Sequence, residues 1–255
     1  MPSTRPTVVL VHGGCSDAST WFGVVAELHR RGLTVLAVAN PLRGLAHDAA
    51  YLADVVAGID GPVVLVGHSY GGAVITEAGA APNVLALVYV AAYLPDVGEN
   101  YCALARRFAP SPLISRLRHT EFTAGGTERA TELSVPADCF RPLVAADLDA
   151  ELAQVLAAIQ RPVADRVLID APTVAAWRAK PSWALVTGAD RALPPAVQRF
   201  TAERAGATVL ELRDASHSVA VSRPTAVAEL IHDAGKADRV QSADLPIEET
   251  APDGH

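Results

Sequence analysis

The chain has 255 residues, half of them hydrophobic, and its 21 basic and 28 acidic side chains give a net charge of −7. This length and apolar fraction allow a sizeable core and exclude a chain that is disordered throughout. No basic patch dominates, so no nucleic-acid partner is expected. The longest apolar run, residues 85–94, has about half the length of a membrane span, so no membrane partner is expected either.

The beginning of the chain and its cysteines suggest a compartment. Residues 1–6 lack the apolar stretch of a secretory signal, and Cys15, Cys102 and Cys139 form no closely spaced pair. An odd, sparse set of cysteines argues against a disulfide framework and is typical of a reducing environment. These features predict a cytoplasmic protein.

Six short apolar runs predict strands at residues 7–11, 34–38, 62–66, 84–90, 183–187 and 208–212. None alternates polar with apolar residues, which is the pattern of strands buried on both faces of a parallel sheet. Helical patterns separate them at residues 20–31, 45–59, 70–80, 194–205 and 223–234. This alternation predicts an α/β fold with a doubly wound, mostly parallel six-stranded sheet.

One stretch interrupts this rhythm. Residues 95–181, between the fourth and fifth predicted strands, are too many for a simple crossover and include a helical pattern at 148–159. We predict an inserted, mostly helical lid there. The core built on the sheet then comprises residues 1–94 and 182–235, and the acidic residues 236–255 are predicted to form a disordered tail.

The strongest motif is Gly-His-Ser-Tyr-Gly-Gly at residues 67–72, directly between the third predicted strand and the following helix. A sharp strand-to-helix turn needs small residues on both sides, which Gly67 and Gly71 supply. Such a turn presents the Ser69 hydroxyl above the sheet, at the positive end of the helix. The context therefore predicts that Ser69 is a nucleophile, the alternative being an incidental serine in a glycine-rich turn.

A serine nucleophile needs a base and a third group that orients the base, and in this type of fold the chain order is Ser, acid, His. His217 follows the last predicted strand in a loop, and we expect it to be the base. Asp190, after the fifth strand, is the expected acid. Asp96, after the fourth strand, is its main rival, and Asp214 lies too close in sequence to His217.

Acyl transfer also requires backbone N–H donors that stabilise the oxyanion of the tetrahedral intermediate. We expect one donor from Tyr70, the residue after the nucleophile. The second is expected from the His12-Gly13-Gly14 segment after the first strand, at Gly14.

Three further features are weaker candidates for pocket residues. Cys15 is expected to be a small buried hydrophobe rather than a reactive thiol. Trp177, near the end of the insertion, is a minor candidate for the pocket wall. The insertion also holds arginines that are expected to be solvated, with anion binding as the alternative, namely Arg106, Arg107, Arg116 and Arg118.

Together these motifs resemble the α/β-hydrolase superfamily, and most closely its small lid-bearing branch of plant methyl-ester esterases, hydroxynitrile lyases and their bacterial relatives. The matching segments are residues 9–14, 67–72, 88–95, 187–195 and 216–217. The resemblance implies acyl-serine chemistry without a cofactor or metal, in which a Ser69–His217–Asp190 triad attacks an ester-like small molecule. We therefore predict a serine hydrolase that cleaves a small carboxylic ester or lactone.

Departures from the branch bear on the reaction. The hydroxynitrile lyases of the branch carry Thr and Lys where this chain has Gly13 and Ser218, which favours hydrolysis. Two alternatives stay open: a non-hydrolytic lyase or biosynthetic enzyme that uses the same pocket, and a ligand-binding protein on a hydrolase fold. The substrate and the oligomeric state, a homodimer included, do not follow from these motifs.

Overall fold

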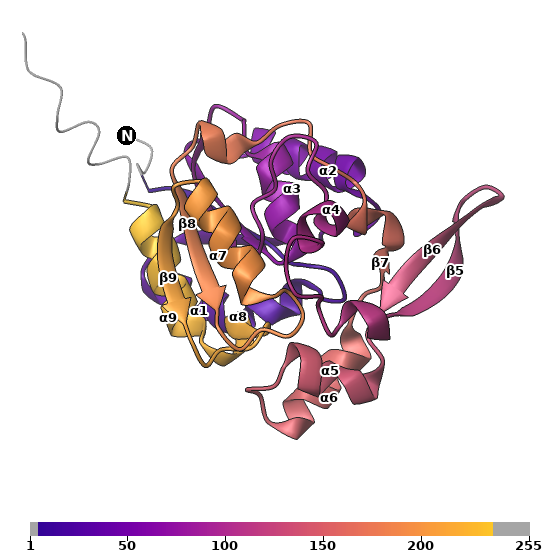
Figure 1. The fold of residues 1–255 in the computed structure, drawn as a ribbon. Helices are drawn as coiled ribbons and strands as arrows, with labels where there is room; N and C mark the ends of the chain where they lie inside the picture. Colours follow the sequence, from indigo (N-terminus) through magenta and orange to yellow (C-terminus); the bar gives the residue numbers. More distant parts are fainter. Residues whose placement is uncertain (1–4, 237–255) are drawn as a thin grey trace, which may run out of the picture.

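The computed structural model describes residues 5–236, and the tail expected at 236–255 lies outside them except for Lys236. Its main sheet has six strands in the order β2-β1-β3-β4-β8-β9, and every neighbouring pair is parallel (Figure 1). The strands are β1 (Thr7–Val11), β2 (Thr34–Val38), β3 (Val63–His68), β4 (Val84–Val90), β8 (Ser182–Thr187) and β9 (Thr208–Leu212). The predicted parallel six-stranded sheet is therefore confirmed.

Helices cover both faces of this sheet. They are α1 (Phe22–Arg30), α2 (Leu45–Ala57), α3 (Tyr70–Ala78), α7 (Pro195–Arg204), α8 (Val219–Ser222) and α9 (Pro224–Ala234), and the 3-10 helix η1 (Ala18–Trp21) precedes α1. Successive residues of a strand point to opposite faces. Accordingly Val9 packs in the cluster that includes α2, α3 and α7, whereas Val8 packs in the cluster of α1 and α9.

The two edge strands differ from the prediction. β2 and β9 are only partly buried, and Leu36 and Val209 are 41% and 48% exposed. The expectation that all six strands are buried on both faces is therefore wrong for these two. An apolar run shows that a segment suits a parallel sheet, but it does not show whether the strand lies at the centre or at the edge.

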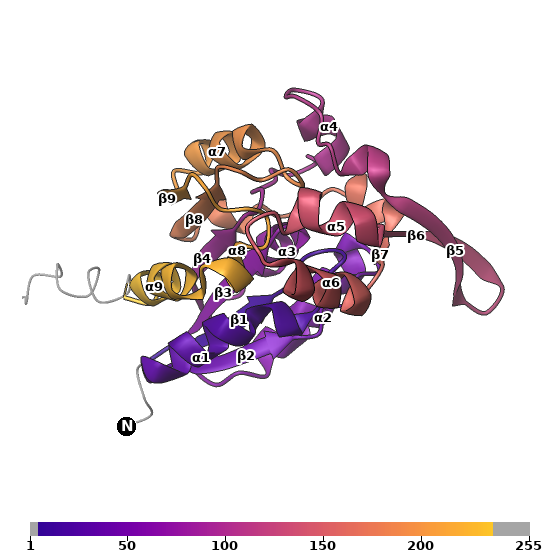
Figure 2. The same cartoon turned by 90° about the horizontal axis from the view of Figure 1, so that it is seen from below.

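Residues 95–181, hereafter the insertion, leave the sheet after β4 and return to it at β8. They contain the helices α4 (Tyr101–Ala105), α5 (Ala137–Val144) and α6 (Ala150–Ile159), and the 3-10 helices η2 (Ile114–Arg116), η3 (Asp165–Leu168) and η4 (Ala176–Arg178). Figure 2 shows α5 and α6 as a neighbouring pair. They pack around a separate small core that includes Phe140, Leu148 and Leu156.

The insertion also contains strands, so the expectation of a mostly helical segment missed part of its structure. β5 (Arg118–Gly125), β6 (Glu128–Ser134) and β7 (Val163–Ala164) form an antiparallel sheet. The largely exposed β5–β6 hairpin projects from the body of the molecule (Figure 1) and turns at Gly126, whose φ is +55°. β7 contacts the core, because the Ala164 N–H donates to the Leu42 carbonyl at 2.9 Å. Across residues 5–236, no helix is long and apolar enough to cross a membrane.

Candidate active site

Ser69 occupies the turn between β3 and α3 with φ 53° and ψ −121°. A side chain in this region of backbone space costs on the order of 1–3 kcal/mol. The glycines on both sides are required by close backbone approach. A Cβ at Gly71 would lie 2.5 Å from the Val11 carbonyl oxygen, and one at Gly67 would collide with the Gly71 backbone. The loop between β3 and α3 thus holds Ser69 at a point where the start of α3 lies close against the ends of β1 and β3.

Asp190 and His217 are joined by a hydrogen bond of 2.7 Å between Oδ2 and Nδ1. The loops after β8 and β9 bring them together, since both strands end at the same edge of the sheet. With Nδ1–H donating to the carboxylate, Nε2 is left without a proton, which is the tautomer that a general base requires.

Four further donors surround the buried Asp190 carboxylate. At 2.8–2.9 Å they are the Thr187 hydroxyl, the Gln198 amide and the backbone N–H groups of Ala192 and Leu193. An ionised carboxylate can only accept hydrogen bonds, so this set of donors suits a charged Asp190. Gln198 was not predicted from the sequence, although a polar residue on the buried face of a helix is a signal for such a role.

The rival acids lie elsewhere. Asp96 is paired with Arg178 through hydrogen bonds of 2.7 and 3.0 Å, and this guanidinium lowers the pKa of the carboxyl. Asp214 is largely exposed and bonds to Arg223 at 3.1 Å. The geometry therefore favours Asp190 over both.

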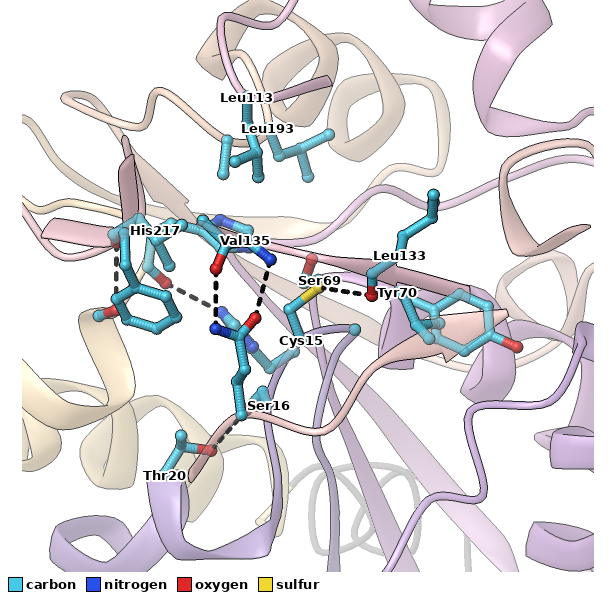
Figure 3. A pocket seen from close by; sticks show the side chains of 18 of the residues that line it. Cys15, Ser16, Thr20, Ser69, Tyr70, Leu113, Leu133, Val135, Leu193 and His217 are labelled. Atoms are coloured by element: carbon cyan, nitrogen blue, oxygen red, sulfur yellow. Dashed lines mark hydrogen bonds between the residues drawn. The ribbon is translucent and has the colours of Figure 1, made fainter. Parts of the chain in front are cut away.

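Ser69 and His217 line one cavity of about 140 Å³, together with Gly14 and Tyr70 (Figure 3). The insertion supplies much of the wall with apolar side chains, among them Leu113, Leu117, Leu133, Val135, Phe140 and Leu156. Figure 3 shows Leu113 and Leu193 across the cavity from Ser69. No lysine or arginine is found among the described residues that line the cavity, and Asp17 is the single carboxylate among them.

The loop after β1 lies against the nucleophile. A Cβ at Gly13 would come within 2.7 Å of the Ser69 Cβ, so only glycine fits there. Tyr70 is the first residue of α3, and its N–H therefore has no partner within the helix. The Tyr70 hydroxyl donates to the buried Asp48 carboxylate at 2.8 Å, which fixes the tyrosine side chain. The structure thus brings both expected oxyanion donors, Gly14 and Tyr70, to the cavity that Ser69 lines.

Two other histidines support these loops. His68 donates from Nε2 to the His217 carbonyl oxygen at 2.9 Å, and their ring centroids are 4.7 Å apart. Burial lowers the pKa of His68 to about 3, so the ring is neutral near pH 7. His12 is also buried, which lowers its pKa, and its Nδ1 lies 3.0 Å from the Gly13 carbonyl. His68 therefore packs beside the turn, and His12 braces the glycine loop.

Of the weaker candidates for pocket residues, only Cys15 lines the cavity. Cys15 lines the cavity, but burial raises the pKa of its thiol to about 12, which makes it a poor nucleophile. Trp177 lies outside the cavity lining, and its indole N–H donates to the Pro95 carbonyl at 2.8 Å. The pocket role considered for Trp177 is therefore wrong. Anion binding in the cavity is also wrong for the four insertion arginines, since none is among the described lining residues.

A model of the alpha/beta hydrolase family matches residues 8–230. The match covers most of the chain, so the chain belongs to this family.

Two relatives with similar sequences are named as esterases. A carbendazim hydrolyzing esterase from Nocardioides sp. (strain SG-4G) is 32% identical over 148 residues, which are 52% of this chain and 61% of that protein. Esterase PIR7B from Oryza sativa subsp. japonica is 35% identical over 133 residues, which are 44% of this chain and 49% of that protein. The matched part thus spans about half to three fifths of these curated relatives.

Solved structures agree on the fold along almost the whole length. Polyneuridine aldehyde esterase superimposes with a TM-score of 0.78 at 22% identity, covering 90% of this chain and 98% of that chain. The methylesterase MES16 from Arabidopsis gives 0.74 at 20% identity with the same coverage. At such identities the likeness shows the shared fold and leaves the activity to be argued from the site.

Proposed function

We propose that this chain is a serine hydrolase that cleaves carboxylic esters, lactones included, through an acyl-serine intermediate. The observation that carries the proposal is the 2.7 Å bond between Asp190 and His217 at a cavity that Ser69 also lines. The esterase names of the relatives point to the same class of reaction.

Each residue of the site has a separate role in the proposed reaction. The Ser69 oxygen attacks the ester carbonyl while His217 Nε2 takes its proton, and Asp190 stabilises the resulting imidazolium. The backbone N–H groups of Gly14 and Tyr70 donate to the oxyanion. His217 then gives the proton to the departing alkoxide, which leaves as the alcohol. Water, deprotonated by the same base, releases the carboxylic acid and restores Ser69.

The cavity lining favours an uncharged, mainly apolar substrate. Its described residues offer no cation to pair with a carboxylate, and the wall from the insertion is almost entirely hydrophobic. Burying an unpaired charge against such a wall costs far more than burying a hydrocarbon. The product acid is a charged carboxylate near pH 7, so the cavity binds it less well than the neutral ester, which assists product release.

The Ser69→Ala variant tests the assignment. We expect hydrolysis of p-nitrophenyl butyrate to fall on the order of 10⁵-fold or more, because the nucleophile and its base act as a unit. A fluorophosphonate probe is expected to label the wild type but not Ser69→Ala. The matched control is Ser115→Ala, an exposed serine of the insertion, which should keep both activity and labelling.

Other results would contradict the proposal in distinct ways. Hydrolysis that persists in Ser69→Ala removes this serine from the mechanism. A wild type that neither hydrolyses esters nor reacts with the probe points to a ligand-binding protein. Labelled protein that turns over no ester, lactone or thioester points to the non-hydrolytic alternative.

A further inference from the structure

His217 lies between two serines that both bond to the insertion. The Ser218 N–H donates to the Val144 carbonyl at 3.0 Å, and the Ser218 hydroxyl donates to the same oxygen at 3.1 Å. On the other side of the histidine, the Ser216 hydroxyl and its N–H both donate to the Asp147 carboxylate, the N–H at 3.2 Å. The backbone before and after His217 is therefore fastened to one short segment of the insertion.

That segment is the end of α5 and the turn that follows it. Val144 is the last residue of α5, and Asp147 lies in the turn between α5 and α6. The Asp147 side chain is 12% exposed, so its charge is largely withdrawn from water. Burial opposes the ionisation of Asp147, but hydrogen bonds to the carboxylate, with those from Ser216 foremost, together outweigh it and lower its pKa. Arg223 adds a cation 4.0 Å away.

The remaining contacts of His217 come from the core. Asp190 orients the ring through Nδ1, and His68 donates to the His217 carbonyl. The Ala189 N–H also fastens the loop to the core by donating to the Ala215 carbonyl at 3.1 Å. The bonds at Ser216 and Ser218 add a second attachment, to the insertion. The insertion therefore takes part in placing the base as well as in forming the cavity wall.

We propose that Asp147 is a positioning residue, through which the insertion holds the His217 loop in its catalytic geometry. This inference rests on the proposed role of His217 as general base. It implies that the α5–α6 pair cannot swing away from the cavity as a rigid body without either breaking these bonds or displacing His217. Substrate access must then occur at another part of the insertion.

The test compares Asp147→Ala with Asp147→Asn and with Asp149→Ala. Asp149 is two residues away and caps α6 through the Leu152 N–H at 2.8 Å, but no described contact joins it to the His217 loop. We expect Asp147→Ala to lower kcat for p-nitrophenyl butyrate about ten- to hundred-fold with little change in KM, because small displacements of a base are costly. Asp147→Asn keeps one acceptor oxygen and should recover part of the loss.

A second readout does not depend on activity. Hydrogen–deuterium exchange of residues 213–222 should quicken in Asp147→Ala and stay unchanged in Asp149→Ala. Unaltered kcat or unaltered exchange in Asp147→Ala would overturn the proposal, as would an equal fall of kcat in both alanine variants. If the wild type hydrolyses no ester, the proposed function has failed. The positioning role then fails with it, while the exchange still reports whether Asp147 orders the loop.

Discussion

The sheet core and the insertion form two sides of the same cavity, and the two sides differ in polarity and in how their side chains are held. On the core side, close backbone approach and buried hydrogen bonds fix each polar group, as at Gly13, Ser69 and Asp190. On the insertion side the wall is hydrophobic, and α5 and α6 have a small core of their own. Polar geometry tolerates little change, whereas an apolar wall can be reshaped by exchanging side chains of different size. The polar groups proposed for catalysis thus come from the core, with the insertion helping to place one of them, and we expect the insertion to select the substrate.

The largest effect that tests this comparison is expected on the core side, for Asp190→Asn. An amide at this position can donate as well as accept, so it no longer enforces the tautomer in which His217 Nε2 is free. We expect kcat for p-nitrophenyl butyrate to fall on the order of 10³–10⁴-fold. Asp96→Asn, which removes the charge of the rival acid, should leave kcat within a few fold. Equal losses in the two variants would mean that Asp190 has no special role.

An intermediate effect is expected on the insertion side, for Leu113→Ala. Leu113 lines the cavity across from Ser69, so we expect its shortening to remove apolar contact with a long acyl group but none with an acetyl group. With about 0.8 kcal/mol for each buried methylene, the ratio of kcat/KM for octanoyl over acetyl esters should fall roughly ten-fold. Ile169→Ala, an exposed site of the insertion outside the cavity lining, should keep the wild-type ratio. A ratio that does not respond to Leu113→Ala would show that the insertion does not select the acyl chain.

The smallest effect concerns stability and lies in the core. The pKa of His68 is about 3 when folded, against an ordinary value of 6.5. The unfolded chain therefore binds one more proton between about pH 3 and 6.5. The contribution of the neutral ring is complete above pH 6.5 and is lost as the pH falls through this window. One proton corresponds to about 1.4 kcal/mol per pH unit in the free energy of unfolding.

Urea unfolding between pH 4 and 6 measures this slope. The His68→Gln variant, which keeps an N–H for the His217 carbonyl, should show a slope smaller by about one proton. His119→Gln, at an exposed position of the β5–β6 hairpin, should retain the wild-type slope. An unchanged slope in His68→Gln would mean that the ring is not kept neutral by burial.

Much of the core followed from local sequence. Four of the six strands begin and end where the apolar runs do, because strands of a parallel sheet are built mainly from β-branched and aliphatic residues. Asp190 could be predicted as the acid that partners His217 because it follows β8, and the fold brings the loops after β8 and β9 to the same edge of the sheet. The triad and the oxyanion donors remain predictions, with a geometry that is consistent with them.

The insertion was harder to predict, for physical reasons. Its hairpin strands are exposed and polar, so they lack the apolar pattern on which strand prediction depends, and only the Gly125-Gly126 pair marks the turn. The bond between Asp147 and Ser216 joins residues 69 positions apart. No local pattern encodes such a contact. Trp177 was considered for the pocket because it is large and apolar, yet its N–H is bonded to Pro95 outside the cavity.

The positive φ of Ser69 has a consequence for how such a chain changes over generations. Glycine adopts this backbone conformation without strain, so a glycine at position 69 would make the fold more stable by roughly 1–2 kcal/mol. Selection for a longer-lived protein and selection for catalysis therefore act in opposite directions at this one codon. A descendant that no longer needs the proposed reaction would gain stability from a change of Ser69 to glycine. Homologues that have lost the activity are thus expected to be more stable than active ones.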